Sequence, residues 1–253
     1  MARLNIVYHP VSGNLKGHIS ESVLPELKNG KKIDFLFPSL RYLTGIKETL
    51  IQNADAVLPG QMYFGTYFTW ANRVLDADHQ VFRIIGSGEE WLLLFMFLKK
   101  IHRLFQELRP GSLSLILKIV TELRESGCSI NPLKDIARTC SDIAPYVECL
   151  NSLFNVASER RLASSPTLLM LFAEHLKNGQ YIPFGDRLVV AGFYEFNPVQ
   201  RKILNSLFDR YPETTLYLPE NTGHPALQYL KPVSEIIENC DYHSTTISQM
   251  KQE

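Results

Sequence analysis

LVVAGFYEFNPVQRKIL, residues 188–204, contains the junction that decides the fold class. Its first four residues are apolar and predict a buried strand. Asn197 followed by Pro198 predicts the start of a helix, because asparagine caps a helix N-terminus and proline suits the first helical position. Ile203 and Leu204 continue that helix with an apolar face. A buried strand that runs into an amphipathic helix is typical of an α/β protein with parallel strands.

The rest of the first third and the segment after this junction follow the same order of strand and helix. Short apolar runs predict strands at residues 4–8, 33–37, 81–85 and 214–218, and helical spacing predicts helices at residues 20–28, 39–52 and 66–75. We therefore expect an α/β fold with a mostly parallel sheet. In that sheet the segments that begin at Leu4, Ile33 and Leu188 should be neighbours.

Residues 88–179 have a different character, because strand signals are missing and helix signals follow one another closely. Asn131 before Pro132 and Ser165 before Pro166 are typical helix starts. We expect four or five helices here, one of them at residues 101–108. The predicted organisation is a discontinuous α/β core, residues 1–87 and 180–253, and an all-helical insertion subdomain, residues 88–179.

Composition narrows the class of protein. The 253 residues include 26 basic and 26 acidic side chains, so no global charge attracts the chain to nucleic acid or to a membrane. The four cysteines contain no CxxC pair, which favours reduced thiols in a cytoplasmic protein over disulfides or a metal site. The most apolar run, residues 91–98, is too short to span a bilayer. We expect no membrane association.

The segment HPVSGNLKGHIS, residues 9–20, follows the first predicted strand and invites comparison with a phosphate-binding loop. That loop has the pattern GxxxxGK[ST], whose lysine contacts the terminal phosphates and whose hydroxyl binds magnesium. Gly13 and Gly17 are one residue too close, and His18 and Ile19 replace the lysine and the hydroxyl residue. Lys16 precedes Gly17 instead of following it. ATP and magnesium are therefore not expected as cofactors, although the turn can still meet a phosphate.

The second strand-to-helix junction also lacks phosphoryl-transfer chemistry. Nucleotide-hydrolysing proteins place acids at the end of a strand to hold magnesium and to orient water. Here the acid nearest the strand is Glu195 alone, a degenerate acid-motif position. The favoured interpretation is that Phe193, Tyr194 and Phe196 pack the corner while Glu195 faces water or supports the helix cap.

Three stretches together resemble a known family. The order Gly-Phe-aromatic-acid-Phe-Asn-Pro-x-Gln after an apolar strand resembles the helicase-like N-terminal region of bacterial PD-(D/E)XK nuclease family proteins, similar to the B subunit of AddAB-type helicase-nucleases. IDFLFPSLRYLTGIKETL, from residue 33, resembles the family's second strand and the loop after it. YFGTYFTWANRVL, residues 63–75, resembles a helix segment of the family.

The resemblance implies a superfamily 1 helicase fold of the UvrD/RecB type, with a P-loop NTPase-like 1A domain and a 1B-like helical subdomain, that has lost its motor. It implies a part in DNA repair and recombination, with single-stranded or forked DNA or a helicase subunit as partner. The family's nuclease core is not recognisable in this chain, so no catalytic residue is assigned to it. Two alternatives stay open: a divergent ATPase or helicase that uses Lys16, and a protein-interaction scaffold without DNA binding.

Candidate DNA- or phosphate-binding residues are those expected near the carboxyl ends of the parallel strands, where ligands usually bind. Cations contact phosphates, and aromatic rings stack on bases. Solvation is the alternative for Lys16 and Arg41, and burial in the core is the alternative for Tyr63. The candidates are Lys16 and His18 in the loop after the first strand, Ser39, Arg41 and Tyr42 after the second, and Tyr63, Thr66 and Arg73 near the third helix.

Overall fold

The structure is a computed structural model. It describes residues 3–10, 13–53, 60–77, 81–100, 110–127, 130–139, 144–178, 184–220 and 242–246. The chain divides into two compact units. The first comprises residues 1–70, 175–196 and 200–253, and the second comprises residues 71–174 and 197–199. The unit boundaries at 70/71 and 174/175 differ from the expected boundaries at 87/88 and 179/180.

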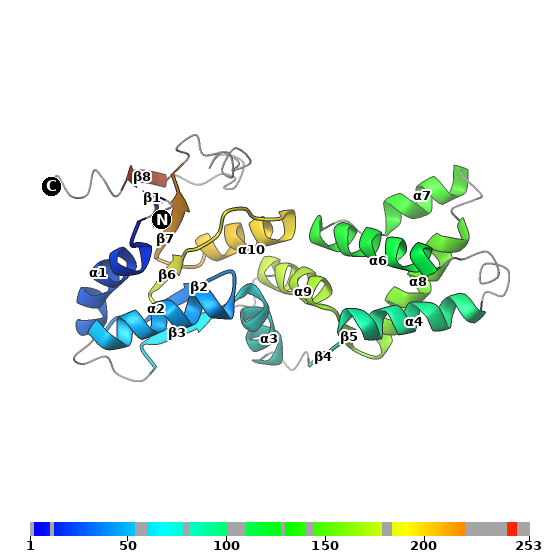
Figure 1. Ribbon diagram of the computed structural model, residues 1–253, viewed down its shortest axis with the longest axis horizontal. Coiled ribbons are helices and arrows are strands. Elements are labelled where there is room, and N and C mark those ends of the chain that lie inside the picture. Colours follow the sequence, from blue (N-terminus) through cyan, green and yellow to red (C-terminus); the bar gives the residue numbers. More distant parts are fainter. Residues whose placement is uncertain are drawn as a thin grey trace. The chain divides into compact units, whose positions relative to one another are not determined.

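The first unit is built on a parallel sheet (Figure 1). The strand order is β3-β2-β6-β7-β1-β8, and every neighbouring pair is parallel. The strands are β1 (Arg3–His9), β2 (Ile33–Leu36), β3 (Met62–Gly65), β6 (Arg187–Val190), β7 (Glu213–Pro219) and β8 (Tyr242–Thr246). The α/β class and the parallel sheet predicted from the sequence are therefore confirmed.

The expected neighbour relationship holds for one pair of strands only. Ile33 pairs in register with Arg187, so β2 and β6 are adjacent. β1 belongs to the same sheet, but β7 separates it from β6. The prediction was wrong on this point because the segment at residues 214–218 was assigned no place in the strand order.

Helices α1 (Leu15–Lys28) and α2 (Leu40–Asn53) pack on one face of this sheet. Alternate strand residues point to the same face, because side chains alternate along a strand. Phe35, Val189 and Tyr217 therefore join Ile19 and Ile46 in one apolar cluster. This cluster explains why both helices have an apolar side, and it fixes their first turns at the carboxyl ends of the strands.

The opposite face of the sheet lies next to α10 (Pro198–Phe208). The connection from β6 to β7 runs in the opposite direction from that between β1 and β2, and right-handed crossovers then place their helices on opposite faces. A buried hydrogen bond ties this side together: the Tyr211 hydroxyl, just after α10, donates to Asp34 Oδ2 of β2 over 2.5 Å. The α10 residues Ile203, Leu204 and Leu207 are fully buried.

The second unit is mostly helical. It includes α4 (Ser87–Lys100), α6 (Pro110–Glu125), α7 (Asn131–Thr139), α8 (Ala144–Glu159) and most of α9 (Ser165–Lys177). Its core includes Leu94, Ile116, Val120, Leu150 and Leu153. The helix expected at residues 101–108 lies outside the described residues.

Two strand predictions need correction. Residues 83–84 form β4 (Arg83–Ile84), which pairs with β5 (Leu162–Ala163) in a separate two-stranded sheet and not in the main sheet. β5 lies in the segment that was expected to be entirely helical. β3 was not predicted, because MYFG is a short stretch whose strand pairing depends on β2. Within the described part of the chain, no helix is long and apolar enough to cross a membrane.

Candidate functional site

The carboxyl ends of β2 and β6 mark the place where this sheet is expected to receive a ligand. The two strands are neighbours, but the chain leaves β2 toward β3 and leaves β6 toward β7, in opposite directions. Ligands of parallel α/β proteins bind at such a topological switch point. Residues 37–42 and 191–194 meet there.

A tyrosine ring fills this point. Tyr42, in the first turn of α2, lies so close to Gly192 that a β-carbon there would be 2.8 Å from two of the ring atoms. Gly192 has a φ of 82°, which favours glycine as well. The Tyr42 ring also contacts Phe37, with 5.5 Å between the ring centres. Burial, with a smaller effect of Tyr194, raises the pKa of Tyr42 to about 12, so its hydroxyl is neutral at physiological pH.

The sequence analysis predicted how the four residues after β6, residues 193–196, pack, and the structure agrees for three of them. Phe193 and Phe196 are buried and stack with their ring centres 4.9 Å apart, and Glu195 is exposed. Tyr194 was expected to pack the corner, but 56% of its surface is exposed. This difference from the expectation matters for ligand binding, because the exposed Tyr194 ring places an aromatic face in solvent beside Tyr42.

The segment after β1 does not offer its backbone to a phosphate. Asn14 caps α1, and its side-chain oxygen accepts from the Gly17 N–H over 3.0 Å. The N–H groups of Gly13, Leu15 and His18 donate to carbonyls inside the same turn. A phosphate loop needs such groups free to point at the ligand.

Lys16 and His18 were placed in a loop by the sequence analysis, and the structure corrects this. Both lie in the first turn of α1, which begins at Leu15 because Asn14 caps it. A β-carbon at Gly45 of α2 would be 2.4 Å from the Lys16 Nζ, so the lysine extends over α2. His18 Nδ1 lies 3.8 Å from a carboxylate oxygen of Glu21.

Ser39 and Thr66 serve as helix caps. The Tyr42 N–H donates to the Ser39 hydroxyl over 3.3 Å at the start of α2. At the start of α3 (Tyr67–Ala77), the Thr66 N–H donates to Thr69 Oγ1 over 2.7 Å and the Thr69 N–H donates back to Thr66 Oγ1 over 3.3 Å. These reciprocal bonds satisfy groups that a helix terminus leaves open. Both hydroxyls are therefore committed to local structure.

The remaining two candidates are not brought to the switch point. Tyr63 of β3 packs in an aromatic cluster with Trp70 and Phe184, at centre distances of 5.8 and 5.2 Å. Arg73 is exposed on the part of α3 that belongs to the second unit. Of the predicted residues, Tyr42 therefore stays beside Tyr194, and Arg41 is exposed in the same first turn of α2. We name Leu40, Arg41, Tyr42 and Tyr194 the carboxyl-edge surface.

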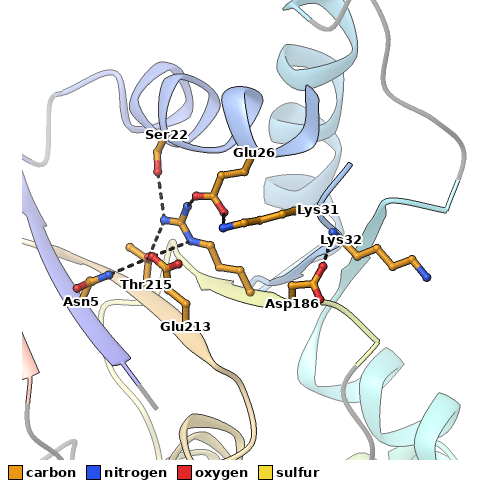
Figure 2. Close-up of polar contacts among 9 residues, drawn as sticks. Asn5, Ser22, Glu26, Lys31, Lys32, Asp186, Glu213 and Thr215 are labelled. Atoms are coloured by element: carbon orange, nitrogen blue, oxygen red, sulfur yellow. Dashed lines mark hydrogen bonds and ion pairs between the residues drawn. The ribbon is translucent and has the colours of Figure 1, made fainter. Parts of the chain in front are cut away.

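A second polar centre, at the amino end of the sheet, was missed by the sequence analysis (Figure 2). Arg187 begins β6 and is 5% exposed. Its guanidinium donates to Glu26 of α1, to the Ser22 hydroxyl over 3.2 Å and to Thr215 Oγ1 over 2.7 Å. Glu213 Oε1 lies 3.9 Å from its Nε.

Further contacts extend this amino-edge network (Figure 2). Lys31 Nζ bonds Glu26 over 3.0 Å, and the Lys32 N–H donates to Asp186 over 2.9 Å. Two cations and two carboxylates, from Arg187, Lys31, Glu26 and Glu213, balance in charge. Because the charges cancel and the arginine is enclosed, the network joins α1 to β6 and β7 rather than binding a ligand. An arginine directly before the buried run LVVA was its sequence signal.

Among the described residues, no group of three or more histidine, cysteine, aspartate or glutamate side chains is arranged to hold a metal ion. Comparison with models of known protein families finds no match, and comparison with curated proteins finds no significant match.

Proposed function

We propose that this chain is a helicase-like domain that lacks a working nucleotide site and binds single-stranded DNA through the carboxyl-edge surface. It would act as a non-catalytic part of a larger DNA repair protein, as the family resemblance implies. The main supporting observation is the pair of tyrosines at the topological switch point, where the Tyr42 ring packs against Gly192 and Tyr194 is exposed beside it.

The surface has the groups that a single strand needs. Tyr194 exposes 56% of its surface and Leu40 exposes 62%, so an aromatic face and an apolar neighbour are available to a base. Arg41 is exposed on the same turn as Leu40 and supplies a cation for a phosphate. Stacking on one aromatic side chain contributes roughly 1–3 kcal/mol per base and tolerates any sequence. The expected binding is therefore weakly sequence-specific.

Binding of a fluorescent oligothymidine, followed by anisotropy at low salt, tests the proposal. Tyr194→Ala should weaken binding by about 5- to 150-fold, the equivalent of one lost stack. Ile51→Ala is the matched control, because Ile51 is also 56% exposed in the first unit and lies at the end of α2. Equal affinity of the wild type and Tyr194→Ala would overturn the proposal.

The charge of the surface gives a second readout. Glu195 is exposed next to Tyr194 and repels phosphates. Glu195→Gln should strengthen binding, whereas Arg41→Ala should weaken it and reduce its salt dependence. Lys47→Ala, an exposed cation farther along α2, is the control for nonspecific charge.

A protein-interaction scaffold is the second candidate. Leu92 and Met96 are 53% and 55% exposed and lie four residues apart on α4, so they occupy one side of that helix. Apolar side chains exposed together favour a protein contact. Capture of a helicase subunit that Leu92→Ser and Met96→Ser abolish, with no binding of single-stranded or forked DNA, would favour this candidate.

A further inference from the structure

The second unit contains a cavity that the proposed function does not use. Its volume is about 410 Å³, within the range of roughly 300–1,000 Å³ typical of small-molecule sites. Phe82, Phe154, Leu162 and Leu171 supply most of its apolar lining. All of these residues belong to the second unit, so the cavity does not depend on the carboxyl-edge surface.

A buried arginine supplies a donor to this cavity. Arg124 is 3% exposed and contributes to the lining. Its Nη1 donates to Glu90 and, over 3.0 Å, to the Ser164 hydroxyl, and its guanidinium carbon lies 4.8 Å from the centre of the Phe154 ring. The Arg124 Nε–H is buried and has no hydrogen-bond partner among the described residues. That Nε has almost no accessible surface, but a guanidinium in the wall of a cavity favours a ligand with an acceptor atom.

A second arginine has an unusual backbone. Arg161 lines the cavity, is exposed, and has a φ of 50°. It is the one residue other than glycine with a positive φ in the described part of the chain. α8 ends two residues earlier, at Glu159, and glycine is the residue favoured in a left-handed conformation at this position. Strained conformations persist where a side chain is needed, so the arginine side chain itself is the feature to explain.

We propose that the cavity binds a nucleotide unit, with the base against the aromatic lining, a base acceptor at the Arg124 guanidinium and the phosphate at Arg161. Glu90 compensates the charge of Arg124, so Arg161 remains to attract an anionic group. An aliphatic acid whose carboxylate pairs with Arg161 would leave the Arg124 guanidinium without a further acceptor, and inorganic phosphate would not use the apolar walls. Nucleotides combine a flat apolar body, ring acceptors and an anion.

The nucleotide unit has two sources, a free nucleoside monophosphate or a base of a single strand. Competition separates them. Displacement of bound deoxyadenosine monophosphate by oligothymidine would assign the cavity to a single strand, and failure to displace it would assign the cavity to the free nucleotide. Both results agree with the chemistry proposed for the cavity.

Equilibrium dialysis of the full chain with labelled deoxyadenosine monophosphate tests the proposal. Arg161→Gly should weaken binding at least tenfold while leaving the melting temperature equal or higher, because glycine suits the left-handed backbone. Arg160→Gly is the matched control, since it removes the same charge one residue away at the same helix terminus. The control should bind within about twofold of the wild type, as expected of a surface cation that contacts no ligand.

Other variants separate the parts of the site. Phe82→Leu keeps an apolar side chain but removes a ring, and it should weaken binding of the monophosphate. Inorganic phosphate alone should not compete. Absence of binding by the wild type, or equal losses for Arg161→Gly and Arg160→Gly, would overturn the proposal. Tyr194→Ala should leave this affinity unchanged, so failure here and failure of the carboxyl-edge surface give different results.

Discussion

The ring of Tyr42 lies directly against the α-carbon of Gly192, at the point where β2 and β6 end. A β-carbon on Gly192 would meet two ring atoms at 2.8 Å and a third at 3.0 Å. The contact joins the two strand-to-helix corners of the switch point. The exposed Tyr194 ring is two residues farther along the chain.

Gly192→Ala should lower the free energy of unfolding by roughly 2–4 kcal/mol, measured by urea denaturation. The left-handed backbone costs an alanine about 1–2 kcal/mol, and the clash with a packed ring adds a similar amount. The Tyr42→Ala background should remove the second part only.

Gly30→Ala is the matched control for that experiment. Gly30 has the same φ of 82°, but a β-carbon there would have no neighbour within 4 Å. It should cost only the backbone strain of about 1–2 kcal/mol. If Gly30→Ala and Gly192→Ala are equally destabilising, the Tyr42 ring does not pack against Gly192 as described.

Arg187→Ala should be strongly destabilising, by about 3–5 kcal/mol, because it leaves Glu26 without its buried cation and Thr215 without its donor. Arg3→Ala is the control, since Arg3 also begins a strand and pairs in register with Glu213 but is exposed. The control should change stability by less than about 0.5 kcal/mol. Similar urea midpoints for the two variants would show that the network does not hold the amino edge of the sheet.

Local pattern was sufficient to predict much of the fold. The apolar runs that became β1, β2, β6 and β7 were found because buried parallel strands read as continuous apolar segments. Pro198 was placed at the start of α10 from its residue type. Helix α1 was predicted five residues too short, because the capping role of Asn14 was not recognised.

The candidate site was harder to predict, since it depends on which strands become neighbours. Thr66 was a candidate for DNA contact, but its hydroxyl caps a helix, as the hydroxyl of Ser39 also does. Tyr63 was a candidate for DNA contact but packs in an aromatic cluster, whereas Tyr194 was expected to be packed but is exposed. Local sequence does not show which aromatic residue faces the core. The partners of Arg187 are distant in sequence and meet only through the register of β6 with β7.

Stability should fall at high pH in a way that depends on Tyr42. Burial raises its folded-state pKa to about 12, above the unfolded value of about 10, so its contribution is complete below pH 10 and is lost as pH rises toward 12. Burial also raises the pKa of Tyr67 and of Tyr217. Between pH 10 and 12, the ionisation of Tyr42 lowers the unfolding free energy by at most about 1.4 kcal/mol per pH unit, because solvent screens part of the effect at this half-buried ring.

Urea denaturation of Tyr42→Phe between pH 8 and about 11.5 isolates one of these contributions. Phenylalanine does not ionise, so the variant should lose less stability above pH 10 than the wild type. Parallel stability curves for the two proteins would contradict the burial of the Tyr42 hydroxyl.

Lys16→Ala should not change the affinity of the chain for ATP with magnesium. The N–H groups of Gly13, Leu15, Gly17 and His18 are engaged within their own turn, Lys16 extends over α2, and Glu195 is exposed. Dialysis with labelled ATP is the measurement, with Lys16→Ala as the comparison. Micromolar affinity that Lys16→Ala abolishes would instead support the divergent ATPase.

Ultraviolet cross-linking of oligothymidine to the full chain, followed by mass spectrometry of tryptic peptides, tests the carboxyl-edge surface most directly. Trypsin cleaves after Arg187 and Arg201, so the peptide of residues 188–201 isolates Tyr194 from the other tyrosines. We predict a cross-link on this peptide at Tyr194, reduced by unlabelled competitor and lost in Tyr194→Ala. A chain that binds oligothymidine without cross-linking to residues 188–201 would contradict the account.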